Sequence, residues 1–261
     1  MNSVNKTLYI PLYGKAYVSK KGIILKDKKA EEIWNKEGFE LKGKSKSKWL
    51  AYFMGMRSAV FDLWVKEKMT EMKDAVIIHI GCGMDSRVLR VKTHNHKWYD
   101  VDFPEVIRER KIHYSETETY KMLEGDARTP KWISDIPERS SAVVIIEGVS
   151  MYLKSDEVKN LMIALNNHFD NVSLMMDCYT EMSAKISKYK NPINDVGVTE
   201  VYGTDHPEIF ETDNFTFLKE HNMTPDTLIN ELKGVEKFFF KKLYGGKFSK
   251  KMYRLFEYKS V

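Results

Sequence analysis

The chain has 261 residues, of which 43% are hydrophobic and 30% are charged, and its formal net charge is +5. This is the composition of a folded globular protein, and the length suits one large domain with a sizeable core. Acids and bases are interspersed, so the charge gives no reason to expect a nucleic-acid partner. Only two cysteines are present, and no apolar run has the length of a membrane span or a signal-peptide core. We therefore expect a reduced, cytoplasmic protein with no membrane partner.

The first part of the chain is expected to be helical over residues 27–35 and 47–73. In the second segment, Phe53, Phe61 and other large apolar residues recur at helical spacing, which predicts one buried face. Arg57 lies on that same face, four residues from each phenylalanine. A buried arginine needs an anionic partner. That partner is either a carboxylate of this protein or the carboxylate or phosphate of a ligand, and the helix alone leaves both open.

Short apolar segments alternate with helical ones in the middle of the chain. Strands buried on both faces and separated by helices indicate an α/β fold with a mostly parallel sheet. The C-terminal third differs, because residues 191–212 are rich in proline, glycine and aspartate and are expected to form an ordered substrate loop. Two strand-like segments, 235–243 and 251–258, predict a closing antiparallel hairpin. The five central strands are expected at residues 75–80, 97–102, 120–124, 142–147 and 172–177.

Glycines or acids stand where the first four strands end. The first strand runs into Gly81-Cys82-Gly83, the second ends at Asp102, and Asp126 and Glu147 follow the next two. The carboxyl ends of parallel strands border a ligand crevice. A dinucleotide fingerprint would need a third glycine where Ser86 stands, which disfavours a nicotinamide cofactor. An acid about 20 residues after the turn can bind ribose hydroxyls. These features favour a nucleoside ligand without phosphates, such as S-adenosylmethionine, whose carboxylate would need a cation and whose ammonium would need an acid.

Several motifs follow one another in an order that is more specific than the glycine turn alone. They lie at residues 10–16, 25–30, 56–57 with 61–62, 80–87, 98–107 and 146–153. On these motifs the chain resembles the leucine carboxyl methyltransferase family, particularly its bacterial polyketide O-methyltransferase-like, tetracenomycin-type branch. The resemblance covers about the first two thirds of the chain and fades after residue 177.

The resemblance implies a class I, Rossmann-like methyltransferase sheet of seven strands. It implies an N-terminal helical cap over residues 1–73 and an S-adenosylmethionine-binding core over residues 74–261. It also implies that Arg57 holds the methionine carboxylate, that Gly81 and Gly83 pass beneath the methionine moiety, and that Asp102 binds the ribose. Asp126 and Ala127 would flank the adenine, and Glu147 would lie near the methionine amino group. Lys15 is a further candidate cofactor contact, and it stands where the branch usually has arginine. No metal is implied, and the histidine and cysteine spacing fits no metal site.

The implied activity is in-line methyl transfer to a hydroxyl or carboxylate of a small molecule, with S-adenosylhomocysteine as product. A carboxylate is already ionised at neutral pH, whereas a phenol would benefit from a general base. His206, Tyr152 and Tyr179 are the candidates for that role, although loop or packing roles are the commoner explanation for such residues. We expect Arg57→Ala and Asp102→Ala to weaken cofactor binding while leaving the fold intact.

Three alternatives stay open at this point. The first alternative is a methyltransferase that acts on the C-terminal carboxyl group of a protein. Only the poorly matching C-terminal third of the chain could distinguish it from a small-molecule enzyme. A non-catalytic S-adenosylmethionine-binding protein is consistent with the same motifs. A nicotinamide oxidoreductase is the third alternative, and Ser86 counts against it.

Overall fold

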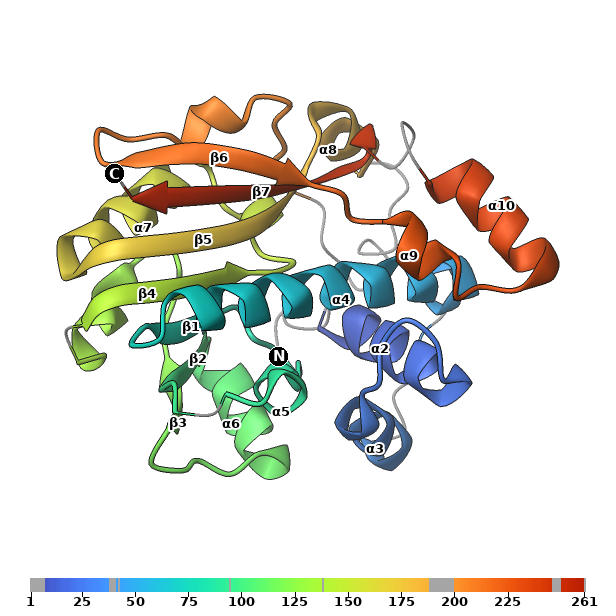
Figure 1. The fold of residues 1–261 in the computed structure, drawn as a ribbon, viewed down its shortest axis with the longest axis horizontal. Helices are drawn as coiled ribbons and strands as arrows, with labels where there is room; N and C mark the ends of the chain where they lie inside the picture. The colour runs from blue at the N-terminus through green and yellow to red at the C-terminus, as the bar shows by residue number, and fades with distance from the viewer. Residues whose placement is uncertain are drawn as a thin grey trace.

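The computed structural model describes residues 8–37, 41, 43–93, 95–137, 139–187, 200–245 and 250–260. Its centre is a seven-stranded sheet with the order β3-β2-β1-β4-β5-β7-β6 (Figure 1). Strands β1 to β5 pair in parallel, and β7 runs antiparallel to both β5 and β6. The predicted α/β class and mostly parallel seven-stranded sheet are confirmed. The strands are β1 Val76–Ile80, β2 Trp98–Asp102, β3 Tyr120–Glu124, β4 Arg139–Ile146, β5 Phe169–Tyr179, β6 Phe215–His221 and β7 Tyr253–Ser260.

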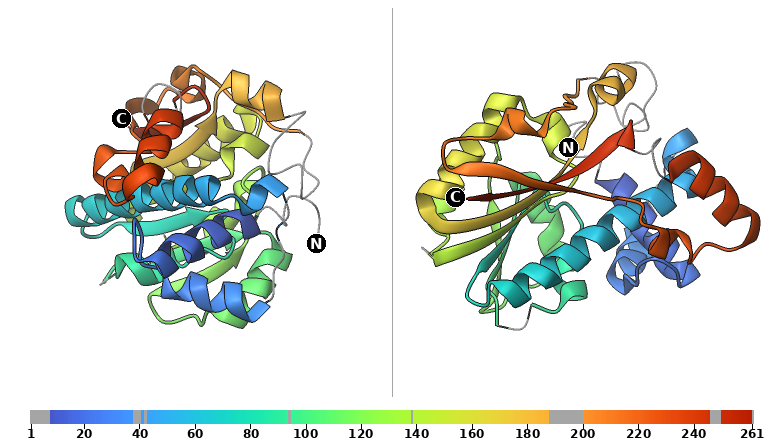
Figure 2. Two further views of the ribbon diagram at one scale, coloured as in Figure 1. Left: turned by 90° about the vertical axis from the view of Figure 1, so that its right-hand side faces the viewer. Right: turned by 45° about the horizontal axis from the view of Figure 1, so that its top comes forward.

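Helices cover both faces of this sheet (Figure 2). The long helix α4 crosses one face, and the predicted helices at 27–35 and 47–73 correspond to α3 and α4. None of the helices among the described residues is long and apolar enough to cross a membrane. The helices are α2 Tyr9–Lys21, α3 Lys28–Glu37, α4 Lys48–Glu71, α5 Arg87–Val91, α6 Pro104–His113, α7 Ser155–His168, α8 Glu181–Ser187, α9 Asp226–Ile229 and α10 Gly234–Tyr244, with short 3₁₀ segments η1 Gly43–Lys46, η2 Pro130–Asp135, η3 Ser150–Tyr152 and η5 Pro207–Phe210.

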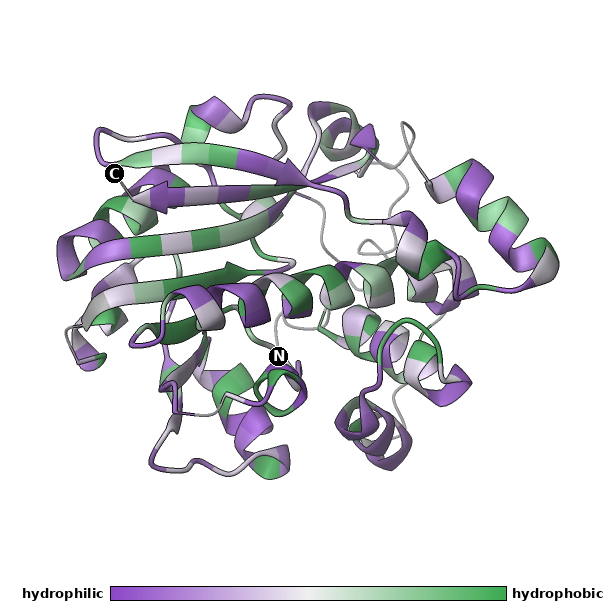
Figure 3. Ribbon diagram, in the orientation of Figure 1, coloured by the Kyte–Doolittle hydropathy of each residue, from purple (hydrophilic) through white to green (hydrophobic). Residues whose placement is uncertain are grey.

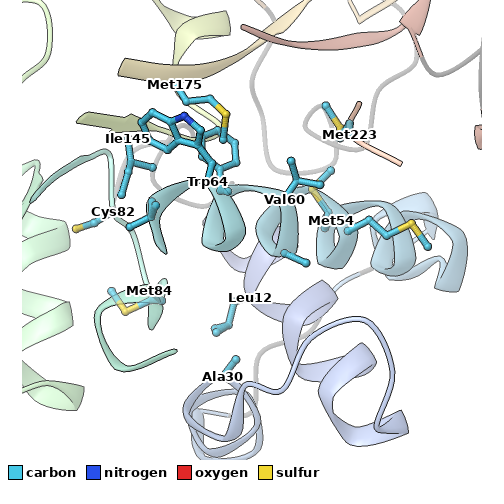
Figure 4. Packing of buried hydrophobic residues seen from close by; sticks show 14 of the residues in the cluster. Leu12, Ala30, Met54, Val60, Trp64, Cys82, Met84, Ile145, Met175 and Met223 are labelled. Atoms are coloured by element: carbon cyan, nitrogen blue, oxygen red, sulfur yellow. The ribbon is translucent and has the colours of Figure 1, made fainter. Parts of the chain in front are cut away.

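The core has two layers, one on each side of the sheet. On one side, Trp64 of α4 packs with Ile145 of β4 and Met175 of β5 (Figure 4). On the other side, residues of α7 such as Leu161 pack against the opposite positions of β1, β4 and β5. Hydrophobic positions run along β4 and β5 in Figure 3, as expected for strands buried on both faces. Helices α2, α3 and α4 therefore share one hydrophobic cluster with the sheet. The expected boundary at residue 74 falls between α4 and β1.

The C-terminal hairpin prediction is wrong in one of its strands. Residues 234–244 form helix α10, and the strand that pairs with β7 is β6, which the sequence pattern missed. Phe240 and Tyr244 lie one helical turn apart, and both pack against the hydrophobic core. Their rings stack at a centroid distance of 5.1 Å. The run of aromatic residues therefore follows a helical period. Strand β6 lies at the sheet edge with many half-exposed positions, so its pattern lacks a continuous apolar run.

Candidate cofactor site

The glycine turn links β1 to α5 at the carboxyl edge of the sheet. Gly81 has φ +67° and Gly83 has φ +49°, a backbone conformation that favours glycine. A Cβ on Gly81 would lie 2.1 Å from Cγ2 of Val149. Arg110 of α6 donates a hydrogen bond to the carbonyl of Gly83 at 2.8 Å. The turn therefore keeps a bare backbone surface in a fixed position, as the sequence predicted.

Gly81→Ala is expected to lower the stability of the protein by about 2–5 kcal/mol, because the methyl group adds a steric clash to the cost of a left-handed backbone. Gly22 offers a matched control, since it has φ +68° and no atom within 4 Å of a built Cβ. Gly22→Ala should show only the backbone cost of about 1 kcal/mol. Urea denaturation of both variants measures the difference. Equal losses would contradict the close approach of Val149.

Asp102 ends β2 directly beside this turn. Its Oδ2 accepts a hydrogen bond from the backbone N–H of Gly83 at 2.8 Å, and its Oδ1 accepts one from Phe103 N–H at 2.8 Å. Within the described ranges, no lysine or arginine forms an ion pair with Asp102. Burial accordingly raises the pKa of its carboxyl to about 6, although the two N–H groups oppose that shift. Each oxygen retains a further lone pair, so the carboxylate can accept hydrogen bonds from two neighbouring hydroxyls.

The raised pKa of Asp102 gives a testable pH dependence. We expect the affinity for S-adenosylhomocysteine to fall as the pH is lowered below about 6, approaching a tenfold loss per pH unit, because protonation removes an acceptor and the negative charge. Calorimetric titrations between about pH 5 and pH 7.5 measure this. Asp102→Asn is the control. This variant should bind S-adenosylhomocysteine more weakly, and its affinity should depend little on pH. A constant affinity for the unsubstituted protein across that range would count against ribose binding by Asp102.

Arg57 projects from α4 into the buried end of the site. Its Nε donates to Glu147 Oε1 at 3.0 Å, and its Nη1 donates to Asp177 Oδ2 at 2.8 Å and to the Tyr253 hydroxyl at 2.9 Å. Burial opposes the charge, but Tyr253, Glu147 and Asp177 outweigh it and raise the pKa of Arg57. Carboxylates of the protein therefore hold the guanidinium. No residue in the described part of the chain accepts a hydrogen bond from Nη2, which lies beside Gly148, so one nitrogen remains for a ligand carboxylate.

Glu147, at the end of β4, joins Arg57 to the glycine-turn side of the site. Its Oε1 also accepts a hydrogen bond from Ser58 Oγ at 3.0 Å, and its Oε2 pairs with Nη2 of Arg87. Burial raises the pKa of Glu147, but Arg87 and Arg57 outweigh it and lower the value to about 2. Both oxygens face the protein's own donors. The structure therefore places Glu147 where it orients Arg57, and its contact with a methionine amino group stays a prediction.

Lys15 lies in a buried network of charges that the sequence reasoning missed. Its Nζ pairs with Asp85 Oδ2 at 2.7 Å, and Arg90 pairs with Asp85 Oδ1 at 2.8 Å. Arg90 also pairs with Asp62 of α4 and with Asp27, which precedes α3, each at 2.7 Å. The network ties the N-terminal helices to the segment that follows the glycine turn. A charged residue on an apolar helix face, as at Asp62, is the signal that could have indicated it.

Asp126 and Ala127 follow β3 on the same edge. The Asp126 carboxylate accepts from Arg128 at 2.9 Å to Nε and 2.6 Å to Nη2, and Ala127 is buried. The Trp132 indole N–H donates to the Asp126 carbonyl at 3.1 Å. This fixes the loop next to β2 and Asp102, where the resemblance expects an adenine. The role of Asp126 and Ala127 in adenine binding stays a prediction.

The three catalytic candidates lie around the ends of β4 and β5. Tyr152 is half-buried in η3, while the Tyr179 ring packs edge-on against Tyr253 at 4.8 Å. The loop at residues 200–206 reaches this edge through Thr204, whose N–H donates to the Tyr179 carbonyl at 2.8 Å. His206 is exposed at the start of η5. The first part of the expected substrate loop, residues 191–199, lies outside the described residues.

In the part of the chain that the structure describes, no three histidine, cysteine, aspartate or glutamate residues are grouped so as to hold a metal ion. The acids at the crevice instead pair with arginines or accept backbone hydrogen bonds, as Glu147 and Asp102 do.

Comparison with known proteins identifies the family. The family model described as "Leucine carboxyl methyltransferase" matches residues 10–166. The tetracenomycin polyketide synthesis O-methyltransferase of Streptomyces glaucescens is 24% identical over 91% of this chain and 90% of its own length. An S-adenosyl-L-methionine-dependent methyltransferase of Gibberella zeae is 28% identical over 65% of this chain and 62% of its own length.

Solved structures with similar folds include a methyltransferase. The magnesium protoporphyrin IX methyltransferase of Synechocystis, solved with bound SAH, superposes with a TM-score of 0.52 at 10% identity, over 95% of this chain and 97% of that one. A DUF574 family protein of Streptomyces avermitilis has a TM-score of 0.58 at 11% identity, over 90% of both chains. At these identities the likeness concerns the fold. The family match over residues 10–166 and the similarity to the two methyltransferases lead to one conclusion: the chain belongs to the leucine carboxyl methyltransferase family and is an S-adenosylmethionine-dependent methyltransferase.

Proposed function

We propose that this enzyme transfers the methyl group to an oxygen atom of a small molecule. The observation that carries the proposal is the similarity to an O-methyltransferase of polyketide synthesis over 91% of this chain and 90% of the relative. A similarity of that extent includes the C-terminal third as well as the motifs around the glycine turn. Membership of a methyltransferase family sets aside the nicotinamide oxidoreductase alternative.

The donor site is proposed at the carboxyl edge of β1 to β4. Arg57 Nη2 would pair with the methionine carboxylate, the bare backbone of Gly81 and Gly83 would pass beneath the methionine moiety, and Asp102 would accept from the ribose hydroxyls. When bound, S-adenosylmethionine supplies a methyl group on its sulfonium sulfur. The acceptor oxygen would take this methyl group in line with the breaking carbon–sulfur bond, and S-adenosylhomocysteine would leave. The ion pairs that fix Arg57 reduce the reorganisation needed to hold the donor in position.

The acceptor side is proposed beyond Arg57, where aromatic residues gather at the start of β7. The Phe53 ring lies 6.0 Å from the Tyr253 ring and 6.1 Å from the Tyr244 ring, and the Tyr179 ring lies 4.8 Å from the Tyr253 ring. Such a wall excludes water and offers flat apolar surface to an organic acceptor. It comes from α4, α10, β5 and β7, so the acceptor would lie where these elements meet.

The need for a general base depends on the acceptor, and Tyr253 is not suited to that role. Burial and Asp177 raise the pKa of Tyr253 well above its ordinary value, so its hydroxyl stays protonated and donates to Asp177 at 2.9 Å. A carboxylate acceptor would arrive ionised and need no proton transfer. Its turnover would be constant from about pH 7 to pH 9, whereas turnover of a phenol would rise toward the phenol pKa near about 10.

An acceptor panel tests the proposal. The purified protein is incubated with methyl-labelled S-adenosylmethionine and with aromatic carboxylates, phenols or a peptide ending in leucine. We expect label on a small molecule. Label on the peptide terminus would favour the protein carboxyl methyltransferase alternative. That alternative stays relevant because the family match ends at residue 166, before β5, α10 and β7, which supply most of the proposed acceptor side. Tight binding of S-adenosylhomocysteine with no turnover across the panel would favour the non-catalytic alternative.

A further inference from the structure

Helix α10 presents an apolar face to solvent. Its opposite face is anchored to the body, where Phe240 is fully buried and Glu236 accepts hydrogen bonds from Lys48 at 2.8 Å and Tyr52 at 2.6 Å. Hydrophobic and hydrophilic residues alternate along the ribbon of α10 (Figure 3). Four large apolar side chains are exposed on it, namely Val235 (69%), Phe238 (64%), Phe239 (45%) and Leu243 (47%).

Positive charge accompanies this apolar face. Lys237, Lys241 and Lys242 lie on the same helix, and together with Gly234 and Phe238 they line a shallow groove. The only acid of α10 is Glu236, and Lys48 and Lys21 pair with it at 2.8 Å and 3.4 Å on the inner side. Lys241 also pairs with Asp226 of α9 at 2.9 Å, whereas Lys237 and Lys242 form no ion pair with the described residues. The outer side therefore combines these lysines with exposed phenylalanines. Figures 1 and 2 show α10 at one end of the molecule, away from the sheet, where a flat surface can approach it.

We propose that α10 docks this enzyme onto an anionic lipid surface. Phe238, Phe239 and Leu243 would enter the boundary between headgroups and acyl chains, while the lysine stems lie along it and the ammonium groups meet phosphates. This is peripheral binding by one helix. It is independent of the cofactor site, to which none of these side chains belongs.

The dimensions and the charge favour a lipid surface over a protein partner. The helix has 11 residues and is therefore about 16 Å long. A stable protein interface buries about 800 Å² on each partner, which is more than one short helix supplies. A second copy of the chain docked on the same face would bring lysines against lysines. An interfacial helix requires only an apolar stripe flanked by basic residues.

Vesicle sedimentation tests the proposal with the full chain. One set of vesicles contains phosphatidylglycerol and phosphatidylcholine in equal amounts, and the other contains phosphatidylcholine alone. We expect binding to the anionic vesicles that is weakened at high salt, and at least about tenfold weaker binding to the neutral ones. The Phe238→Ser/Phe239→Ser variant should bind anionic vesicles at least about tenfold more weakly than the unsubstituted protein. Ile112 of α6, also 64% exposed, provides the matched control, because Ile112→Ser should bind like the unsubstituted protein.

Two further measurements keep the outcome decisive. The affinity for S-adenosylhomocysteine should be unchanged in the phenylalanine variant, which shows that the fold and donor site remain. If that variant does not fold, Lys237→Glu/Lys242→Glu replaces it, with the same expected loss. Absence of binding to anionic vesicles, or an equal loss in Ile112→Ser, would overturn the proposal. A dimer that the phenylalanine variant converts to a monomer, without vesicle binding, would overturn it in favour of self-association.

Discussion

Replacing Arg57 with alanine is expected to weaken S-adenosylhomocysteine binding by at least about 100-fold and to destabilise the protein by about 3–5 kcal/mol. The affinity falls because the ligand carboxylate loses its proposed cation. The stability falls because Glu147 and Asp177 remain buried after their common partner is removed. The sequence alone led us to expect an intact fold in this variant, and these two ion pairs change that expectation. Calorimetry and urea denaturation measure the two effects separately.

Arg57→Lys provides the control for this prediction. A lysine keeps the positive charge near the two carboxylates but lacks the fork of donors that binds a carboxylate in two places. We therefore expect most of the stability to return while the affinity stays reduced by about tenfold or more. A folded Arg57→Ala protein with near-native affinity would disprove the assignment of Arg57 to the ligand carboxylate.

Asp102→Asn is expected to reduce affinity by about 10- to 100-fold with little loss of stability. The pKa of Asp102 is about 6 in the folded protein, above its value of about 3.9 in an unfolded chain. The folded state therefore binds the proton more tightly, and stability falls as the pH rises between these values. At neutral pH the ionised carboxylate disfavours folding. Removing its charge offsets the weaker hydrogen bonds to Gly83 and Phe103.

Asp100 is a matched control two residues earlier on the same strand. It is fully buried and pairs with Arg110, and the pKa of its carboxyl is lowered because Arg110 outweighs the effect of burial. Asp100→Asn should therefore destabilise the protein by several kcal/mol, since a buried arginine loses its partner. If Asp102→Asn and Asp100→Asn lost the same stability, the contrast between a binding carboxylate and a structural one would be wrong.

The carboxyl edge of the sheet could be predicted because its signals are local. Each buried strand is a short apolar run, and the residue that follows it must lie at the crevice whatever the rest of the chain does. This placed the glycine turn, Asp102, Asp126 and Glu147 on one edge before any coordinates. The local pattern gave the wrong secondary structure for residues 234–244. A run of aromatic residues is compatible with both a strand and a helix until the buried face is known.

The partners of the charged residues could not be predicted, because they are far apart in sequence. Lys15 and Asp85 are separated by 70 positions, and Arg57 and Asp177 by 120. The helix pattern showed that Arg57 is buried and left two partners open, a protein carboxylate or a ligand. The structure shows protein carboxylates as partners of Nε and Nη1, and the described residues accept no hydrogen bond from Nη2. Such pairings depend on how whole elements pack, which periodicity does not record.

The place of β7 in the sheet has a consequence for how the enzyme is made. In the described sheet, β6 pairs only with β7, and β7 separates it from β5, although β7 is translated after both. A nascent chain on the ribosome must therefore hold β5 as an open edge and β6 without a partner until residues 253–260 emerge. Tyr253, the first residue of β7, contacts both Arg57 and Asp177. The cluster of hydrogen bonds around Arg57 and Asp177 is thus completed only when β7, the last of the seven described strands in the sequence, inserts between β5 and β6.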